Sequence, residues 1–212
     1  MTGWAPKRFW SDVAVAPAEG GFSVALDGRP VRTPLKAPLV VPTAPFAEEV
    51  AGEWRAQGET LDPRSMPATR LANVVLDRVA DGRAEVAAML AGYGASDLLS
   101  YRAEGPSALV ERQAAAWNPV VAWAAEALGA PLATSAGVMP VAQDPKALAA
   151  LAARVDAIEP FHLAAFHDLV ALSGSLLLAF AVTEGWLAPE EAWSLSRLDE
   201  DFQAEEWGQD EE

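Results

Sequence analysis

Two histidines and the acids beside them are the side chains of this sequence best suited to acid–base or metal chemistry. Glu159 and His162 have the Glu-x-x-His spacing of carboxylate di-iron proteins, which need two copies of that motif. The second histidine, His167, lies five residues after His162, about 140° away around a helix, so the two rings point apart. With Asp168 these residues leave open a small metal-dependent or acid–base enzyme. The simpler interpretation is that they are polar residues at the start of a core helix.

Other catalytic motifs are missing from the sequence. There is no cysteine, which excludes disulfides, thiol catalysis and thiolate metal ligands. Neither a Gly-x-Ser-x-Gly elbow nor a phosphate-binding Gly-Lys-Ser/Thr motif occurs, and the chain has only three lysines. The sequence therefore predicts no catalytic residue, no metal and no cofactor.

Composition and charge narrow the class of protein further. Fifteen basic and thirty acidic residues give a net charge of −15 over 212 residues, which disfavours nucleic acid and anionic membranes as partners. A hydrophobic share of 51% is enough for a globular core. The uncharged stretch 169–183 is shorter than the ~20 residues of a membrane span and predicts a buried helix instead. No targeting pattern opens the chain, so we expect a cytoplasmic protein without membrane insertion.

The first third of the chain has the pattern of a small antiparallel sheet. Within residues 22–26 the large apolar side chains Phe22, Val24 and Leu26 fall on one face, the period-two pattern of a half-buried strand. Asp27-Gly28 then suits a type I′ turn, in which both central residues have positive φ. Residues 13–16 are a plausible partner strand. We predict a short β-meander.

A helix is expected after the meander. Thr43 is a candidate N-cap, Pro45 suits the first turn, and Gly58 ends the helix. Its apolar stripe consists of Phe46, Val50 and Trp54. An extended connector follows, and the domain boundary is expected at Met66-Pro67.

Helical patterns dominate the remaining chain. The helix that contains Trp117 is expected to end or kink at Pro119. Asp144-Pro145 opens another helix, and Ala188-Pro189 opens a final acidic one.

These patterns together define the predicted fold. We expect an α+β protein with a small β-rich antiparallel N-terminal domain that contains one helix, residues 1–66. A larger all-helical domain with an acidic C-terminal helix follows, residues 67–212.

Eight tryptophans are the most unusual feature of the composition. Core packing is expected for Trp54, Trp117 and Trp123. For Trp4, Trp10 and Trp207, which lie near the chain ends among charged residues, exposure at a partner surface competes with core packing as an interpretation.

The last fourteen residues contain eight acids and no base, with apolar residues between them. Acids near a helix C-terminus oppose its dipole, so this helix end is expected to be weakened. The segment is therefore either a solvated, frayed tail or a recognition element for a basic partner.

A series of motifs resembles a known family along nearly the whole chain. The motifs are Lys7–Trp10, Leu26–Pro34, Glu53-Trp54 with Gln57, Met66–Asn73, Asp97–Leu99 with Tyr101-Arg102, Gln113 with Trp117-Asn118-Pro119, Leu198–Gln203 and Trp207-Gly208. In order and spacing they resemble the assembly chaperones that bind the α subunit of the F1-ATPase, found in mitochondria and α-proteobacteria.

The resemblance implies a chaperone rather than an enzyme. Such a protein holds the isolated ATP synthase α subunit until the β subunit replaces it, without a cofactor, and we expect it to be a monomer when free. The important acid of the family's C-terminal motif matches Glu200 best, although the flanking Asp199 and Asp201 are one residue away. The resemblance also places Phe202, Gln203 and Trp207 among the partner-binding residues.

Overall fold

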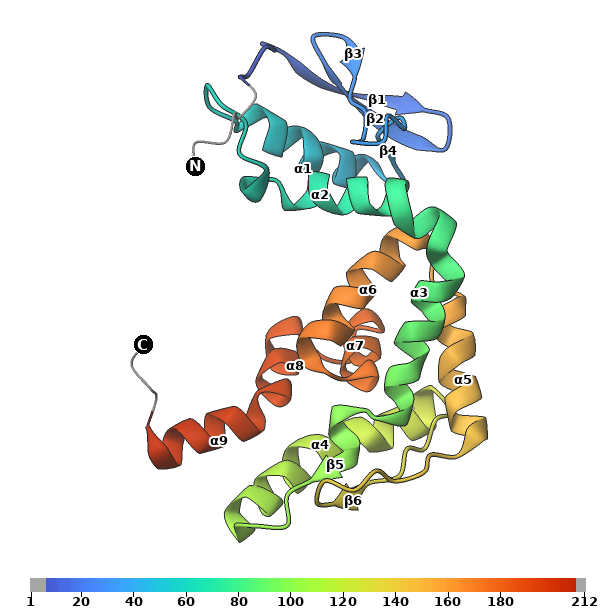
Figure 1. The fold of residues 1–212 in the computed structure, drawn as a ribbon, viewed down its shortest axis with the longest axis vertical. Coiled ribbons are helices and arrows are strands. Elements are labelled where there is room, and N and C mark those ends of the chain that lie inside the picture. Colours follow the sequence, from blue (N-terminus) through green and yellow to red (C-terminus); the bar gives the residue numbers. More distant parts are fainter. Residues whose placement is uncertain (1–6, 209–212) are drawn as a thin grey trace. The chain divides into compact units, whose positions relative to one another are not determined.

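The computed structural model describes residues 7–208, apart from the side chains of residues 80 and 81. The chain forms two compact units, Met1–Arg83 and Ala84–Glu212, called here the N-terminal and C-terminal units. An antiparallel sheet in the first unit and helices in the second confirm the predicted order of β-rich and helical parts (Figure 1).

The N-terminal unit is built on a small antiparallel sheet. Its strands are β1 (Val13–Ala18), β2 (Gly21–Leu26), β3 (Arg29–Pro30) and β4 (Val40–Val41). Strand β2 is central, because β1, β3 and β4 all pair with it. The predicted turn is confirmed, since Asp27 and Gly28 have φ of 47° and 76°. Gly21 is required for packing, because a Cβ there would lie 2.2 Å from the Val41 carbonyl oxygen.

Helix α1 (Ala44–Arg55) packs on this sheet and begins where the sequence predicts (Figure 1). The Thr43 hydroxyl accepts a hydrogen bond from the Phe46 amide at 3.3 Å, which confirms the N-cap. Val50, a residue of this helix, is fully buried.

Helix α2 (Pro67–Val74) belongs to the N-terminal unit because α1 holds its first turn. The Glu53 carboxylate accepts hydrogen bonds from the amides of Ala68 at 2.6 Å and Thr69 at 2.8 Å. It also accepts one from the Thr69 hydroxyl at 2.6 Å. The compact units consequently divide at residue 83, later than the expected Met66-Pro67 boundary. A 3-10 turn (Pro63–Ser65) precedes α2, and a π-helix (Val75–Val79) follows it.

Helix α3 (Ala80–Gly92) spans the division between the units, with non-helical φ and ψ of −98° and 15° at Gly82. Two 3-10 turns follow, Tyr93–Ala95 and Leu98–Ser100. The remaining helices are α4 (Ser107–Ala127), α5 (Pro145–Asp156), α6 (Pro160–Ser173), α7 (Leu176–Thr183), α8 (Pro189–Ser196) and α9 (Leu198–Trp207). Besides these helices the C-terminal unit contains a short parallel pair of strands, β5 (Tyr101–Arg102) with β6 (Ser135–Ala136).

Helix α7 forms the centre of the C-terminal unit, and residues 176–181 are all buried. The uncharged stretch 169–183 is two helices rather than one, because Gly174 ends α6 in the left-handed conformation with φ of 68°. Among the helices of the described chain, none has the length and apolar character needed to cross a membrane.

A buried aspartate fixes the start of α7. The Asp97 carboxylate accepts hydrogen bonds from the Ser175 hydroxyl at 2.8 Å, the Leu177 amide at 3.1 Å and the Leu99 amide at 3.0 Å. Complete burial raises the pKa of Asp97, although these donors oppose the shift. Asp97 therefore has a structural role between two segments about 80 residues apart.

Two helix boundaries differ from the sequence prediction. Helix α4 continues through Pro119, because Trp117 and Val120, each 1% exposed, are buried on both sides of the proline. The expected final acidic helix is divided into α8 and α9 at Arg197, whose φ and ψ are −102° and 9°. The predicted start of α5 is confirmed, since Asp144 accepts a hydrogen bond from the Lys146 amide at 2.9 Å.

Candidate partner-binding site

The acidic helix α9 is attached to the C-terminal unit by its apolar residues. Leu198 and Phe202, one helical turn apart, are 5% and 8% exposed, and the helix packs against α4 and α8. Because the chain divides at Arg197, three acids lie in the first turn of α9. There the helix dipole stabilises them. The acids at the end of α9 oppose the dipole, as the sequence analysis expects for that helix end.

A buried glutamine links α4 to α9. Gln113 is 1% exposed, and its Nε2 donates a hydrogen bond to the Asp199 carboxylate at 2.7 Å. Its Oε1 accepts a hydrogen bond from the Ala103 amide at 2.8 Å. The Gln113 side chain therefore fixes the first turn of α9 from a residue 86 positions earlier in the chain.

An exposed ion pair makes a second link, at the other end of α9. Both Arg112 guanidinium nitrogens contact the Glu205 carboxylate, at 2.6 and 2.9 Å. The hydrogen bond lowers the pKa of Glu205 and raises the pKa of Arg112.

Trp117 and Arg102 pack against each other near the start of α9. The Trp117 indole donates a hydrogen bond to the Leu195 carbonyl at 2.9 Å, and the Arg102 guanidinium lies 5.2 Å from the Trp117 ring centroid. Desolvation lowers the pKa of Arg102, while the nearby Asp199 carboxylate opposes that shift.

A cleft of about 510 Å³ lies beside Trp117. Its lining combines polar residues of α8 and α9 with the end of α6: Leu98, Trp117, Ala171, Leu172, Ser173, Gly174, Ser196, Arg197, Asp199, Glu200 and Gln203. The Glu200 side chain is 53% exposed and lies 3.6 Å from the Arg197 guanidinium. Such an exposed pair contributes little to stability.

The predicted site residues thus have different positions. Asp199, Glu200 and Gln203 all line the cleft. Asp199 is partly buried and bound to Gln113, whereas Glu200 and Asp201 are exposed. Phe202 is buried, so any role in binding is indirect.

The tryptophans also separate into buried and exposed groups. Trp207 is 80% exposed, as the partner-surface alternative requires, while Trp4 lies outside the described residues. Trp10 is 5% exposed and packs edge-on against Trp54 at 5.1 Å, so the partner-surface alternative is wrong for Trp10. Trp193, which the sequence alone did not single out, is 50% exposed beside the cleft residue Arg197.

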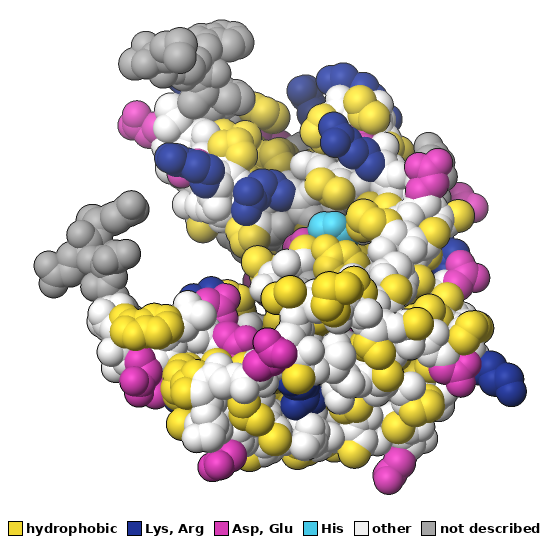
Figure 2. Space-filling model, turned by 60° about the horizontal axis from the view of Figure 1, so that its bottom comes forward, with side chains coloured by type: hydrophobic (Ala, Val, Ile, Leu, Met, Phe, Trp, Pro, Cys, Tyr) yellow, Lys and Arg dark blue, Asp and Glu magenta, His cyan; other side chains and the backbone are white. Residues whose placement is uncertain are grey.

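The excess negative charge lies in the unit that carries the cleft. The N-terminal unit has ten basic and ten acidic residues, whereas the C-terminal unit has five basic and twenty acidic ones. The net charge of −15 therefore belongs entirely to the C-terminal unit. On the face shown in Figure 2, acidic side chains lie beside hydrophobic ones.

The residues of the alternative enzyme site, Glu159, His162, His167 and Asp168, lie at the start of helix α6 and along it. Within residues 7–208, no group of three or more His, Asp or Glu side chains is placed to hold a metal ion. His162 is exposed, while the His167 Nδ1 lies 3.2 Å from the Asp168 carboxylate. Glu159 is the N-cap residue of α6, without a side-chain cap.

Similar solved structures include proteins from two bacteria. Atp12 from Paracoccus denitrificans is 51% identical, with 96% of this chain and 88% of that chain covered and a TM-score of 0.94. A mutant of that protein with one aspartate replaced by lysine gives 51% identity, coverage of 96% and 87%, and a TM-score of 0.95. The Atu1473 protein from Agrobacterium tumefaciens is 46% identical, with coverage of 97% and 78% and a TM-score of 0.91. The chain therefore has the fold of these bacterial proteins over nearly its whole length.

Sequence comparisons define the family. The family described as ATP12 chaperone protein matches residues 7–125. The mitochondrial protein atp12 of Schizosaccharomyces pombe is 25% identical over 214 residues, which cover 95% of this chain and 74% of that protein. The chain therefore belongs to the ATP12 chaperone family, a family of chaperones of ATP synthase assembly.

Proposed function

We propose that the protein binds the isolated α subunit of the F1-ATPase and prevents its aggregation until the β subunit replaces it. Family membership is the observation that carries this proposal. The acidic and apolar C-terminal unit supports it, because a subunit without its neighbours exposes apolar surface that aggregates unless it is covered. We place this activity in the bacterial cytoplasm, in keeping with the bacterial relatives.

Release does not require ATP in this proposal. A temporary partner needs an interface of modest size that includes polar groups. The β subunit displaces the chaperone if it binds the same face of α more tightly, so the difference in affinity drives the exchange. A partly polar cleft fits such a reversible contact better than a wholly apolar surface.

Glu200 is the acid that we propose contacts the partner. Asp199 is engaged by Gln113 and holds the helix, whereas Glu200 is half-exposed at the cleft. Trp207, at 80% exposure, is the aromatic residue best placed to reach a partner from the end of α9, and Gln203 lies between these two residues along the helix.

The experiment is co-expression of the chaperone variants with the α and β subunits, followed by measurement of soluble assembled F1. Glu200→Lys is expected to fold, because an exposed substitution changes stability by about 0.5 kcal/mol or less, but to lose assembly. Glu126→Lys is the matched control, since this exposed acid of α4 gives the same change in charge away from the cleft. Normal assembly with a folded Glu200→Lys protein would contradict the assignment of Glu200. Failure of the parent protein to bind α would contradict the proposed function.

A further inference from the structure

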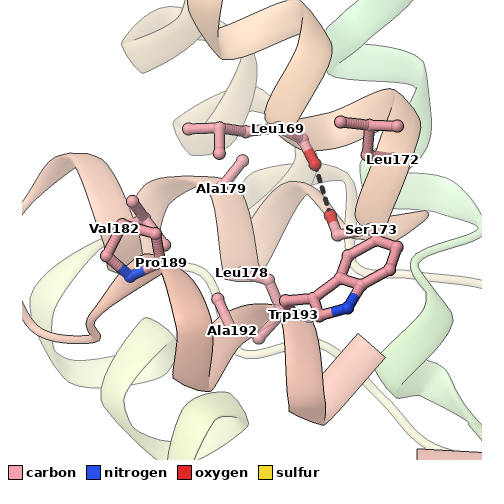
Figure 3. A pocket seen from close by; sticks show the side chains of 9 residues that line it. All are labelled: Leu169, Leu172, Ser173, Leu178, Ala179, Val182, Pro189, Ala192 and Trp193. Carbon is pink, nitrogen blue, oxygen red and sulfur yellow. Dashed lines mark hydrogen bonds between the residues drawn. The ribbon is translucent and has the colours of Figure 1, made fainter. Parts of the chain in front are cut away.

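An apolar hollow lies between helices α6, α7 and α8, and the proposed function does not account for it. It has a volume of about 80 Å³ and is lined by Leu169, Leu172, Ser173, Leu178, Ala179, Val182, Pro189, Ala192 and Trp193. Figure 3 shows Trp193 on one side of this space and Leu169 on another. Pockets for small organic ligands have volumes of ≈ 300–1,000 Å³, so this hollow suits one apolar side chain.

The lining of the hollow is effectively apolar, because the hydroxyl group of its one serine, Ser173, is already hydrogen-bonded within α6. The Ser173 Oγ donates to the Leu169 carbonyl at 2.6 Å, the bond drawn in Figure 3. At the rim, Leu172 is 71% exposed and Trp193 is 50% exposed. Single exposed apolar residues are ordinary, but two at the rim of one hollow form a surface that a partner can cover.

The hollow is continuous with the acidic cleft. Leu172 and Ser173 line both spaces. Trp193 also connects them, because its ring lies 5.6 Å from the guanidinium carbon of the cleft residue Arg197. Arg197 is in turn 3.6 Å from the Glu200 carboxylate. A ligand side chain in the hollow would therefore lie near Arg197, with the Glu200 carboxylate on the other side of that guanidinium.

We propose that the hollow and the cleft form one two-part docking surface for a basic amphipathic segment of the α subunit. One aliphatic or aromatic side chain enters the hollow, and a neighbouring lysine or arginine pairs with Glu200. Charge complementarity supports this occupant, because the C-terminal unit carries five basic and twenty acidic residues. A second copy of this chain would bring the same negative charge and be repelled. The inference rests on the proposed function, since it names the part of α that is recognised.

Site-specific cross-linking tests the hollow directly. A benzophenone amino acid replaces Leu172 in the full-length protein, which is then mixed with purified α and irradiated. The control position is Val138, which is 90% exposed in a loop of the same unit. We expect Leu172, and not Val138, to cross-link to one α segment that contains lysine or arginine beside an apolar residue. Cross-linking to a neutral or acidic segment, or to a second copy of the chaperone, would overturn the inference.

Affinity measurements separate the two parts of the surface. Trp193→Ala is expected to weaken α binding roughly tenfold, because it removes apolar contact in the hollow. Most of the salt dependence should remain, since Glu200 stays in place although its neighbour Arg197 loses the contact with the Trp193 ring. Glu200→Gln is expected to reduce the salt dependence itself. If the parent binds α while Trp193→Ala binds equally well and Leu172 gives no cross-link, the inference fails and the proposed function stands. If the parent does not bind α at all, both fail.

Discussion

Replacing Gln113 by alanine tests whether the position of α9 depends on the buried link to α4. The change removes the Nε2 donor of Asp199, 2.7 Å away, and the Oε1 acceptor of the Ala103 amide, 2.8 Å away. It leaves the other buried side chains of α4, such as Leu109 and Trp117, unchanged. The backbone carbonyl of Gln113, which accepts from Arg102 at 3.3 Å, also remains.

The expected loss of stability follows from these two bonds. A hydrogen bond to a charged group contributes roughly 1.5–3 kcal/mol, and a buried donor left without a partner costs roughly 1–3 kcal/mol. Asp199 and Ala103 are both partly buried, which favours the lower ends of these ranges. Gln113→Ala should therefore lower the free energy of unfolding by about 2.5 kcal/mol.

Urea unfolding followed by circular dichroism measures this loss, and hydrogen exchange locates it. Amides of α9 should exchange faster in Gln113→Ala, and α binding should weaken although Glu200 is unchanged. Arg112→Ala is the comparison, because it removes only the exposed pair with Glu205 and should cause a clearly smaller loss. A change of less than about 0.5 kcal/mol in Gln113→Ala, with α9 exchange as in the parent, would refute the proposed role of this link.

Three further substitutions test other features of the structure. Gly28→Val should destabilise the N-terminal unit by about 1–2 kcal/mol in thermal unfolding, because a β-branched residue resists the φ of 76°; an unchanged melting temperature would contradict this. Because Arg112 lowers the pKa of Glu205, their pair stabilises the fold above the ordinary carboxyl pKa and is lost as the pH falls. The Tm advantage of the parent over Glu205→Gln should therefore shrink between about pH 7 and pH 3, and a constant difference would argue against the pair. His162→Ala and His167→Ala should each retain α binding, and a folded variant that loses it would show that these residues are functional.

Local signals were the ones that predicted the fold correctly. The Asp27-Gly28 turn, the Thr43 cap and the Asp144 cap each depend on hydrogen bonds or torsion angles within a few residues. Such features need no information about distant parts of the chain, so the sequence alone was sufficient.

Features decided by tertiary packing were not predictable in the same way. Pro119 removes one helical hydrogen bond, yet the burial of Trp117 and Val120 on either side keeps α4 continuous. Trp10 is near the chain end in sequence, but its indole donates to the Trp54 carbonyl at 3.3 Å and its ring packs on Trp54. Position in the sequence therefore says little about exposure when the contact spans more than forty residues.

The candidate site includes features that the sequence predicts and features that depend on tertiary packing. The motif around Glu200 could be found from the sequence, but the neighbouring acids could not be distinguished there. Both Asp199 and Glu200 line the cleft, but Gln113 binds Asp199 from 86 residues away while the Glu200 side chain is 53% exposed, which is why we propose Glu200 as the contact residue. Trp193 had no distinguishing pattern, since its exposure depends on how α6, α7 and α8 pack.

Binding of purified α subunit, followed by addition of β, tests the central claim most directly. Isolated α is mixed with the chaperone, the complex is measured by size-exclusion chromatography with light scattering, and β is then added in increasing amounts. We predict a soluble complex of the chaperone with α, from which β releases free chaperone without ATP. The account would be contradicted if α aggregates equally with and without the chaperone, or if β fails to displace it.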